Sequence, residues 1–447
     1  PMSHSTGKSR LPKPIAFLFE NSLFLIFGAV GAMIWANVDF ESYDNFVHFP
    51  ITGEHHEADV TSELADDGHQ EEANTADEHA SHGHGVTIHF LINDILMAMF
   101  FAIAASEVWE ALLPGGALSN PKKAATPLLA TLGGIVGPAG LYLLGAVMIG
   151  KMAILGSGWA IPCATDIAFS YLVARMIFGN GHPAIAFLLL LAIADDAAGL
   201  AILAVAYPQG DGGIQLQWLL LVLGGMAACG MFRKFRIQNF WIYLLTAGTL
   251  SWVGFLKAGI HPALGLVPII PCLPHAHTDL GIFARAELHR SDTLNALTHW
   301  WKNPVEIVLG LFGLVNAGVP LESENFGAAT WLVLLGLIIG KPVGIMLFTF
   351  ISEKCFKLQI PSGMTYRHIF VIGLIASIGF TVSLFVTTAA FPTSGADVTD
   401  EPVAVSNAAK LGALLSFAGA AVAFAGAKIL GIRPSGDSGG QTEETTE

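Results

Sequence analysis

The chain has 447 residues, of which 53% are hydrophobic and only 13% are charged. A soluble globular protein carries about 25% charged residues, so this composition, with a mean hydropathy of +0.60, indicates a protein embedded in a membrane. The formal net charge is −14, but thirteen acidic residues lie between Asp39 and Glu78, a stretch without Lys or Arg. The rest of the chain is close to electrically balanced, which excludes the basic surface that nucleic-acid binding requires.

The four cysteines stand apart, with no Cys-x-x-Cys spacing. They indicate neither a disulfide scaffold nor a thiolate metal site. We expect no cofactor.

Twelve apolar segments are candidates for membrane spans, since a helix needs about 20 mostly apolar residues to cross a hydrocarbon core of about 30 Å. They cover residues 15–38, 86–112, 124–149, 159–177, 183–207, 214–232, 238–257, 260–273, 304–321, 326–352, 367–391 and 403–430, the eighth being short. We therefore predict an all-α polytopic membrane protein of about 12 helices. A cytoplasmic N-terminus (1–14) precedes the transmembrane domain (15–430), and a disordered cytoplasmic tail (431–447) follows it.

The orientation follows from Lys and Arg, which are retained in short cytoplasmic loops. Alternate connections hold Lys122/Lys123, Arg175, Arg233/Lys234/Arg236, Arg285/Arg290/Lys302 and Lys354/Lys357/Arg367, and Lys428/Arg433 follow the last span. The other connections are nearly bare, with Lys151 and Lys257 as exceptions. This alternation predicts an even number of spans with both termini in the cytoplasm.

The first long connection, residues 39–85, is expected to be an acidic, His-rich external loop. Eight histidines lie between His48 and His89, and the low hydrophobicity predicts disorder at least in the middle. One interpretation of this segment is that two of these histidines bind a metal ion together. A solvated acidic linker is the favoured interpretation.

Asp195 and Asp196 lie in the middle of the apolar stretch 188–203. An ionisable side chain inside a span costs about 2.5–3.5 kcal/mol on insertion scales, so it is a functional candidate by default. Adjacent residues of a helix point about 100° apart, so the two carboxylates cannot share one narrow polar stripe. A structural ion pair is the alternative, but a single carboxylate would serve that purpose.

Asp166 follows a proline in the apolar segment Trp159–Phe169. Pro162 removes a backbone donor and breaks or kinks a helix, which places Thr165 and Asp166 near a new helix N-terminus. Asp166 could merely cap that helix. However, a helix break at membrane depth is tolerated only where it lines a cavity or is buried in protein.

Lys341 lies deep inside the span 326–352, where a buried ammonium needs a carboxylate partner or loses its proton. The segment Ser377–Ser383 is interrupted by Gly, Ser and Thr and is expected to be the counterpart of the break at Pro162. Asp94, Glu107, Glu110 and His261 are weaker candidates, for which structural and gating roles both remain open.

At these residues the chain resembles the NhaA family of bacterial sodium/proton antiporters over most of residues 20–430. The resemblance rests on six segments: Leu91–Phe101 (LINDILMAMFF), Gly158–Phe169 (GWAIPCATDIAF), Leu191–Asp196 (LAIADD), Asn316–Val319 (NAGV), Ile339–Ile345 (IGKPVGI) and Ile378–Thr381 (IGFT). It implies inverted repeats with two interrupted, crossing helices. It also implies an inner-membrane location, a homodimer, and Na⁺, Li⁺ and H⁺ as transported ions.

The resemblance implies roles for particular residues. Asp195 and Asp196 match the family's central ion- and proton-binding pair, and Thr165 with Asp166 matches its unwound-helix site. Lys341 matches the lysine that pairs with the first carboxylate. The paired Asp-Asp form resembles the electrogenic members, which move more protons than sodium ions per cycle.

Three regions depart from the family pattern. Glu107–Ala111 (EVWEA) lacks the basic residues of the family's Val-Lys-Arg-Glu, and Ala296–Trp301 (ALTHWW) replaces a Glu-His cluster. Both regions are associated with pH sensing, so the resemblance does not imply a pH profile for this chain. The His-rich outer loop likewise differs from the family's outer hairpin, which is associated with dimerisation.

The expected activity is exchange of Na⁺ for H⁺ by alternating access, because the same carboxylates can bind either ion while an empty charged site is costly to move through the apolar barrier. An intramembrane aspartyl protease is the alternative enzyme, but the chain lacks a Gly-x-Gly-Asp-like segment. A cation channel is the third class. Flux measurements in proteoliposomes distinguish all three.

Overall fold

The computed structural model describes residues 23–51, 86–116, 118–119, 121–209, 213–274, 292–322, 325–392, 400–432 and 434. Within these ranges every regular element is helical, apart from an isolated bridge between Pro50 and Thr87. The predictions for residues 1–22, for most of the acidic loop (52–85) and for the tail beyond residue 434 lie outside the described residues.

The helices are interrupted by short 3-10 or π turns, labelled η. The first half of the chain forms α2 (Leu23–Val38), α3 (Phe40–Val47), α4 (Ile88–Phe90), η1 (Leu91–Leu96), α5 (Met97–Leu112), α6 (Pro121–Met148), α7 (Met152–Leu155), η2 (Gly156–Cys163), α8 (Ile167–Phe178) and α9 (Pro183–Ala206). The middle forms η3 (Leu216–Trp218), α10 (Leu219–Lys234), α11 (Phe240–Ile242), η4 (Tyr243–Gly248), α12 (Thr249–Ala258), η5 (Pro262–Leu264), η6 (Val267–Cys272) and α14 (Thr293–Asn316). The last part forms α15 (Ala328–Leu335), η8 (Gly336–Gly340), α16 (Lys341–Phe356), α17 (Tyr366–Ala376), α18 (Phe380–Ala390), α19 (Asp400–Leu415), η9 (Ser416–Ala418) and α20 (Gly419–Ile429).

Among the described residues, six helices are long and apolar enough to cross a membrane, or eight if each of two bent helix pairs counts as one span. The six are Ile88–Leu112, Ala124–Met148, Pro183–Ala206, Leu216–Lys234, Ala328–Phe356 and Pro402–Ile429. The structure therefore has the all-helical, polytopic architecture that the sequence predicts.

Two expected segments differ in the structure. The predicted external loop begins with a helix, α3, whose N-terminus is capped by the Asp39 carboxylate accepting a hydrogen bond from Ser42 N at 3.0 Å. The eighth expected span consists of the two short turns η5 and η6 in place of a regular α-helix. Prolines within residues 262–271 explain this, because each removes a backbone donor and clashes with the preceding turn.

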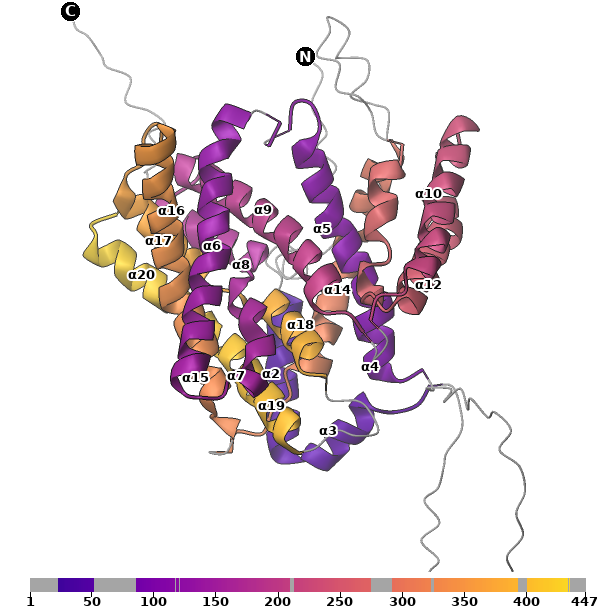
Figure 1. Ribbon diagram of the computed structural model, residues 1–447, viewed down its shortest axis with the longest axis horizontal. Helices are drawn as coiled ribbons and strands as arrows, with labels where there is room; N and C mark the ends of the chain where they lie inside the picture. Colours follow the sequence, from indigo (N-terminus) through magenta and orange to yellow (C-terminus); the bar gives the residue numbers. More distant parts are fainter. Residues whose placement is uncertain are drawn as a thin grey trace, which may run out of the picture.

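The helices form two packed groups that meet along α5 and α9 (Figure 1). On one side α6 packs against α16, α17 packs against α16 and α20, and α18 packs against η2 and α19. On the other side α10 packs against α12, and α9 runs obliquely between the two groups in Figure 1. The larger apolar core joins α6, α9 and α16–α18, and a smaller one joins α5, α10 and η6.

Candidate functional site

The chain breaks between η2 and α8, where Pro162 predicted an interruption. The two halves are bent by 51°, and Ala164 between them is extended, with ψ of 150°. Asp166 is the N-cap of α8, and its Oδ1 accepts a hydrogen bond from Phe169 N at 3.2 Å. The predicted position of Asp166 at a new helix N-terminus is confirmed.

A second break lies between α17 and α18, whose axes are bent by 52°. The two breaks contact each other directly: Asp166 N donates to Ile378 O at 2.7 Å, and the Thr381 hydroxyl donates to Asp166 Oδ2. The Thr165 hydroxyl also reaches Ala376 O at 3.3 Å. Backbone groups left unpaired by each interruption are thus satisfied by the other segment, as a membrane interior demands.

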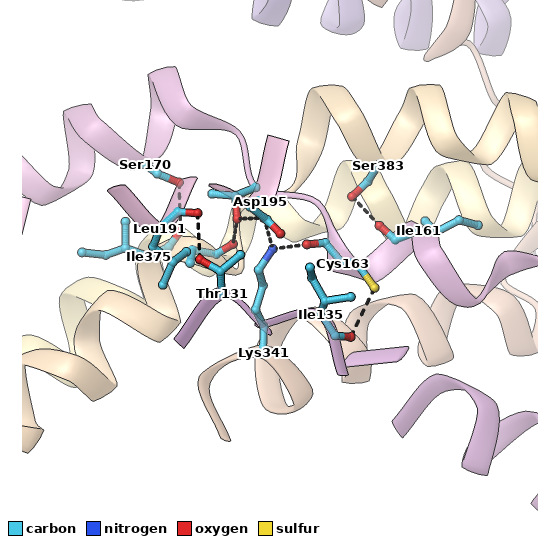
Figure 2. Close-up of polar contacts among 12 residues, drawn as sticks. Thr131, Ile135, Ile161, Cys163, Ser170, Leu191, Asp195, Lys341, Ile375 and Ser383 are labelled. Atoms are coloured by element: carbon cyan, nitrogen blue, oxygen red, sulfur yellow. Dashed lines mark hydrogen bonds and ion pairs between the residues drawn. The ribbon is translucent and has the colours of Figure 1, made fainter. Parts of the chain in front are cut away.

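Asp195 of α9 is held by side chains from two other parts of the chain. Its Oδ2 accepts a hydrogen bond from the Thr165 hydroxyl at 2.7 Å and lies 3.0 Å from Lys341 Nζ (Figure 2). Lys341 is fully buried and Asp195 is 5% exposed, so the pair is removed from solvent. The pairing of Lys341 with the first carboxylate, which the resemblance implied, is present in the structure.

The ammonium of Lys341 also joins the first break. Nζ donates to the carbonyl oxygen of Cys163, the last residue of η2, as Figure 2 shows. The carbonyl oxygens at a helix C-terminus carry partial negative charge. Lys341 therefore neutralises both a carboxylate and the exposed end of a half-helix.

Asp196 faces a different environment from its neighbour. It is partly exposed and lines a cavity of about 590 Å³, together with Thr165, Asp166 and Thr381. The divergence of the two side chains agrees with the 100° between successive helix positions. One carboxylate is thus ion-paired, while the other faces open space.

Further ionisable side chains line the same cavity. Glu107, Glu110 and Glu306 line it with Lys302 and His299. A much smaller cavity, of about 30 Å³, lies among Cys163, Asp195, Asp196 and apolar side chains such as Leu200 and Leu203, in the half of α9 that follows the aspartates. A volume of this size holds about one water molecule.

The structure thus gathers Asp195, Asp196, Asp166, Thr165 and Lys341 in one place and puts Glu107 along the cavity.

Asp94 and His261 lie in a separate cluster, in which His261 Nδ1 is 3.7 Å from Asp94 Oδ1 and accepts from Ala263 N at 3.3 Å. They are not among the residues that line the cavity.

Two contributors were missed by reasoning from the sequence. Thr381 lies in the Ile378–Thr381 segment that carried the resemblance, so its position could have been found there. The carbonyl oxygen of Cys163 could not, because any residue supplies a carbonyl and only the break exposes this one.

The chain is similar over most of its length to a known group of proteins. Residues 19–427 match the family model described as Na⁺/H⁺ antiporter 1. The chain belongs to the Na⁺/H⁺ antiporter 1 family. It is 48% identical over 443 residues to a protein of Jannaschia sp. (strain CCS1) named Na(+)/H(+) antiporter NhaA, an alignment covering 93% of this chain and 98% of that relative.

Two further relatives carry the same name. The one from Geotalea uraniireducens (strain Rf4) is 44% identical, with coverage of 95% of this chain and 99% of the relative. The one from Desulfitobacterium hafniense (strain DSM 10664 / DCB-2) is 41% identical, with coverage of 95% and 98%.

Membership in the Na⁺/H⁺ antiporter 1 family decides among the three classes that the sequence left open. The chain is an integral membrane transporter that exchanges Na⁺ for H⁺, rather than a protease or a channel.

Proposed function

We propose that this antiporter works by alternating access, with Asp195 and Asp196 binding either Na⁺ or H⁺ in turn. The asymmetry of the space around the two aspartates carries this proposal. A cavity of about 590 Å³ reaches Asp196, whereas the cavity beside the following half of α9, lined by Leu200 and Leu203, holds only about 30 Å³. A site open to one side at a time is the geometry that alternating access requires.

The oxygen atoms around Asp196 suit a sodium ion. Na⁺, like other hard cations, takes oxygen ligands, which carboxylates, hydroxyls and carbonyls supply. Asp196, Asp166 and Thr165 line the cavity with such groups, and Lys341 neutralises Asp195 behind them. The uncompensated carboxylates give the empty site negative charge, so a Na⁺ or a proton must bind before the site crosses the apolar barrier.

The cavity opens, in this proposal, to the cytoplasm. Glu107, Glu110 and Lys302 line it, and they lie near span ends that the Lys and Arg pattern assigns to the cytoplasmic side. The conformation is then inward-facing. Both termini are cytoplasmic and the protein lies in the bacterial inner membrane.

We further propose 12 spans arranged as inverted repeats, with the two broken helices crossing at the site. The hydrogen bonds that join Asp166 to Ile378 and Thr381 support this arrangement. Exchange is electrogenic and extends to Li⁺, and the protein forms a homodimer. Two adjacent carboxylates can accept two protons, while a sodium ion brings a single charge, which supports electrogenic exchange.

The test is Na⁺-driven pH change in proteoliposomes, with and without an imposed voltage. In vesicles with wild-type protein, Na⁺ flowing down its gradient should drive protons in the opposite direction across the membrane. A voltage that is negative inside should change the exchange rate in one direction, and a voltage that is positive inside should change it in the other. Asp196→Asn should abolish exchange, because an amide can neither carry the charge that Na⁺ neutralises nor take up a proton. Asp195→Asn should be severely impaired, with residual exchange.

Glu41→Gln is the matched control, since it makes the same carboxyl-to-amide change at an exposed position of α3. It should exchange like the wild type. Wild-type rates in folded, monodisperse Asp196→Asn would refute the assignment of the site. A voltage-insensitive rate would refute electrogenic exchange.

A further inference from the structure

A second large cavity lies away from the ion pathway, between α5, α9, α12 and the turns η5 and η6. Its volume is about 360 Å³, and all of its lining residues are apolar or aromatic, among them Trp109, Ala201, Ala204, Phe255 and Val267. The cavity separates the helix that carries the two aspartates from the helix group containing α10 and α12.

Small side chains on α9 create this space. Ala197, Ala201 and Ala204 are spaced by four and three residues, so they share one face of the helix. Ala201 is exposed although it lies inside the membrane span Pro183–Ala206, and only 33% of the most apolar part of that span is buried. The face of α9 next to α12 is therefore not filled by protein side chains.

The surroundings decide what fills the cavity. Water needs two to four polar partners, and the apolar lining does not supply them. The cavity reaches the lipid-facing surface, because Ala201, which lines it, is exposed within the span Pro183–Ala206. Val205, next to Ala204, is 74% exposed, and Leu256, next to Phe255, is 37% exposed.

We propose that the acyl chain of a bilayer lipid enters this cavity and packs between α9 and the α12–η6 segment. Hydrocarbon matches the lining, and the surrounding bilayer supplies it at high concentration. The chain completes the packing of the half of α9 that follows Asp196. A role of the acyl chain in the movement of α9 rests on the proposed alternating access. Binding of the acyl chain does not depend on that proposal.

Trp109 provides a direct test, because it lines the cavity and bromine atoms on an acyl chain quench indole fluorescence on contact. The full chain is reconstituted into phosphatidylcholine vesicles with or without brominated acyl chains. Subtracting the emission of Trp109→Phe isolates the signal of Trp109. The same subtraction with Trp331→Phe gives a reference on the lipid-facing surface, since Trp331 is 58% exposed.

The expected result is that both Trp109 and Trp331 lose most of their emission in brominated vesicles. Ala204→Phe should fill the cavity and restore the Trp109 signal, while Val205→Phe, which adds the same ring one residue away on the exposed side, should not. If Ala204→Phe does not fold, Ala201→Leu replaces it.

Unchanged Trp109 emission in brominated vesicles would overturn the proposal. Quenching that persists in the folded cavity-filling variant would overturn it too, because bromine would then reach the indole by another route. The fluorescence measurement needs no ion gradient, so its result is independent of the exchange measurements.

Discussion

At the scale of single residues, the decisive feature is the unequal treatment of two adjacent aspartates. Asp195 is buried against Lys341 and Thr165, while Asp196 faces the large cavity. A buried ion pair gains little net stability over apolar packing, because desolvation offsets the attraction between the charges. Its presence here is explained better by transport, in which the net charge of the site must be controlled, than by stability.

Replacing Lys341 should nevertheless be costly. Lys341→Ala leaves the buried carboxylate of Asp195 without its cation, and breaking a buried pair costs about 3–5 kcal/mol of unfolding free energy. The melting temperature of the purified protein near neutral pH should fall clearly. Lys257→Ala is the control, because Lys257 is exposed at the end of α12. Equal melting temperatures for the two variants would mean that Lys341 is solvated rather than paired.

At the scale of helices, close contact of backbones positions Lys341. Gly133 and Gly137 of α6 face Gly344 and Gly340 at the start of α16 and the end of η8, and a Cβ on any of them would overlap a facing backbone atom. Small residues allow membrane helices to approach this closely. This close approach brings Lys341, the first residue of α16, next to the break between η2 and α8.

Gly133→Ala should therefore separate α6 from α16. The added methyl group would overlap the carbonyl oxygen of Gly344, and such overpacking costs about 1–3 kcal/mol. We expect a lower melting temperature and a lower exchange rate. Gly140→Ala, a matched change in the same helix, meets nothing within 4 Å and should retain both properties. If the two variants had the same melting temperature and exchange rate, backbone contact between α6 and α16 would not determine the position of Lys341.

The N-terminus of α9 predicts a pH dependence of stability. His182 caps this helix, and its Nδ1 accepts a hydrogen bond from Ala184 N at 3.1 Å, which requires an unprotonated nitrogen. Burial lowers the pKa of His182 below its ordinary value of 6.5, so protons bind the unfolded chain more readily. The stabilisation is present above that ordinary value and is lost as the pH falls below it toward the folded-state pKa.

His182→Asn keeps a capping acceptor that does not titrate. The melting temperature of the wild type should fall between roughly pH 7.5 and pH 5, spanning the ordinary histidine pKa, and the variant should lose less over the same interval. Thermal unfolding of both proteins at the two pH values checks this. An identical acid-induced decrease in wild type and variant would exclude His182 as a contributor.

At the scale of the whole molecule, all the residues assigned to the proposed transport site lie outside residues 52–85. The residues that flank this segment are nevertheless ordered. Helix α3 precedes it, and Pro50 and Thr87, on either side of it, form an isolated antiparallel bridge. If the segment lies on the external side, as proposed, its histidines and carboxylates could concentrate cations near that surface. Screening limits such an effect to a Debye length of about 8 Å at physiological salt.

Deleting residues 54–82 should therefore leave maximal exchange nearly intact. We expect, at most, a change in the apparent sodium affinity at low ionic strength or a weak response to zinc. Both are measured by sodium-driven pH change in proteoliposomes, at low and physiological salt. Complete loss of exchange in a folded deletion variant would make this segment part of the transport machinery.

Features that depend on local chemistry were readable from the sequence alone. Composition determined the membrane class, Pro162 determined a helix break, and the cost of charge in hydrocarbon singled out Asp195, Asp196 and Lys341. The same reasoning missed α3, because a short polar helix in an acidic stretch has no strong local signal. It also expected a regular helix at residues 260–273, where the prolines decided otherwise.

Only the tertiary structure decided which atoms meet. Lys341 and Asp195 are 146 positions apart, and Thr381 and Asp166 are 215 apart. Such pairings depend on how closely whole helices approach and at which angle, which no local pattern encodes. The unequal sizes of the two cavities at Asp196 are likewise a property of the packed helices, because the same side chains could line a pathway open to either face of the membrane.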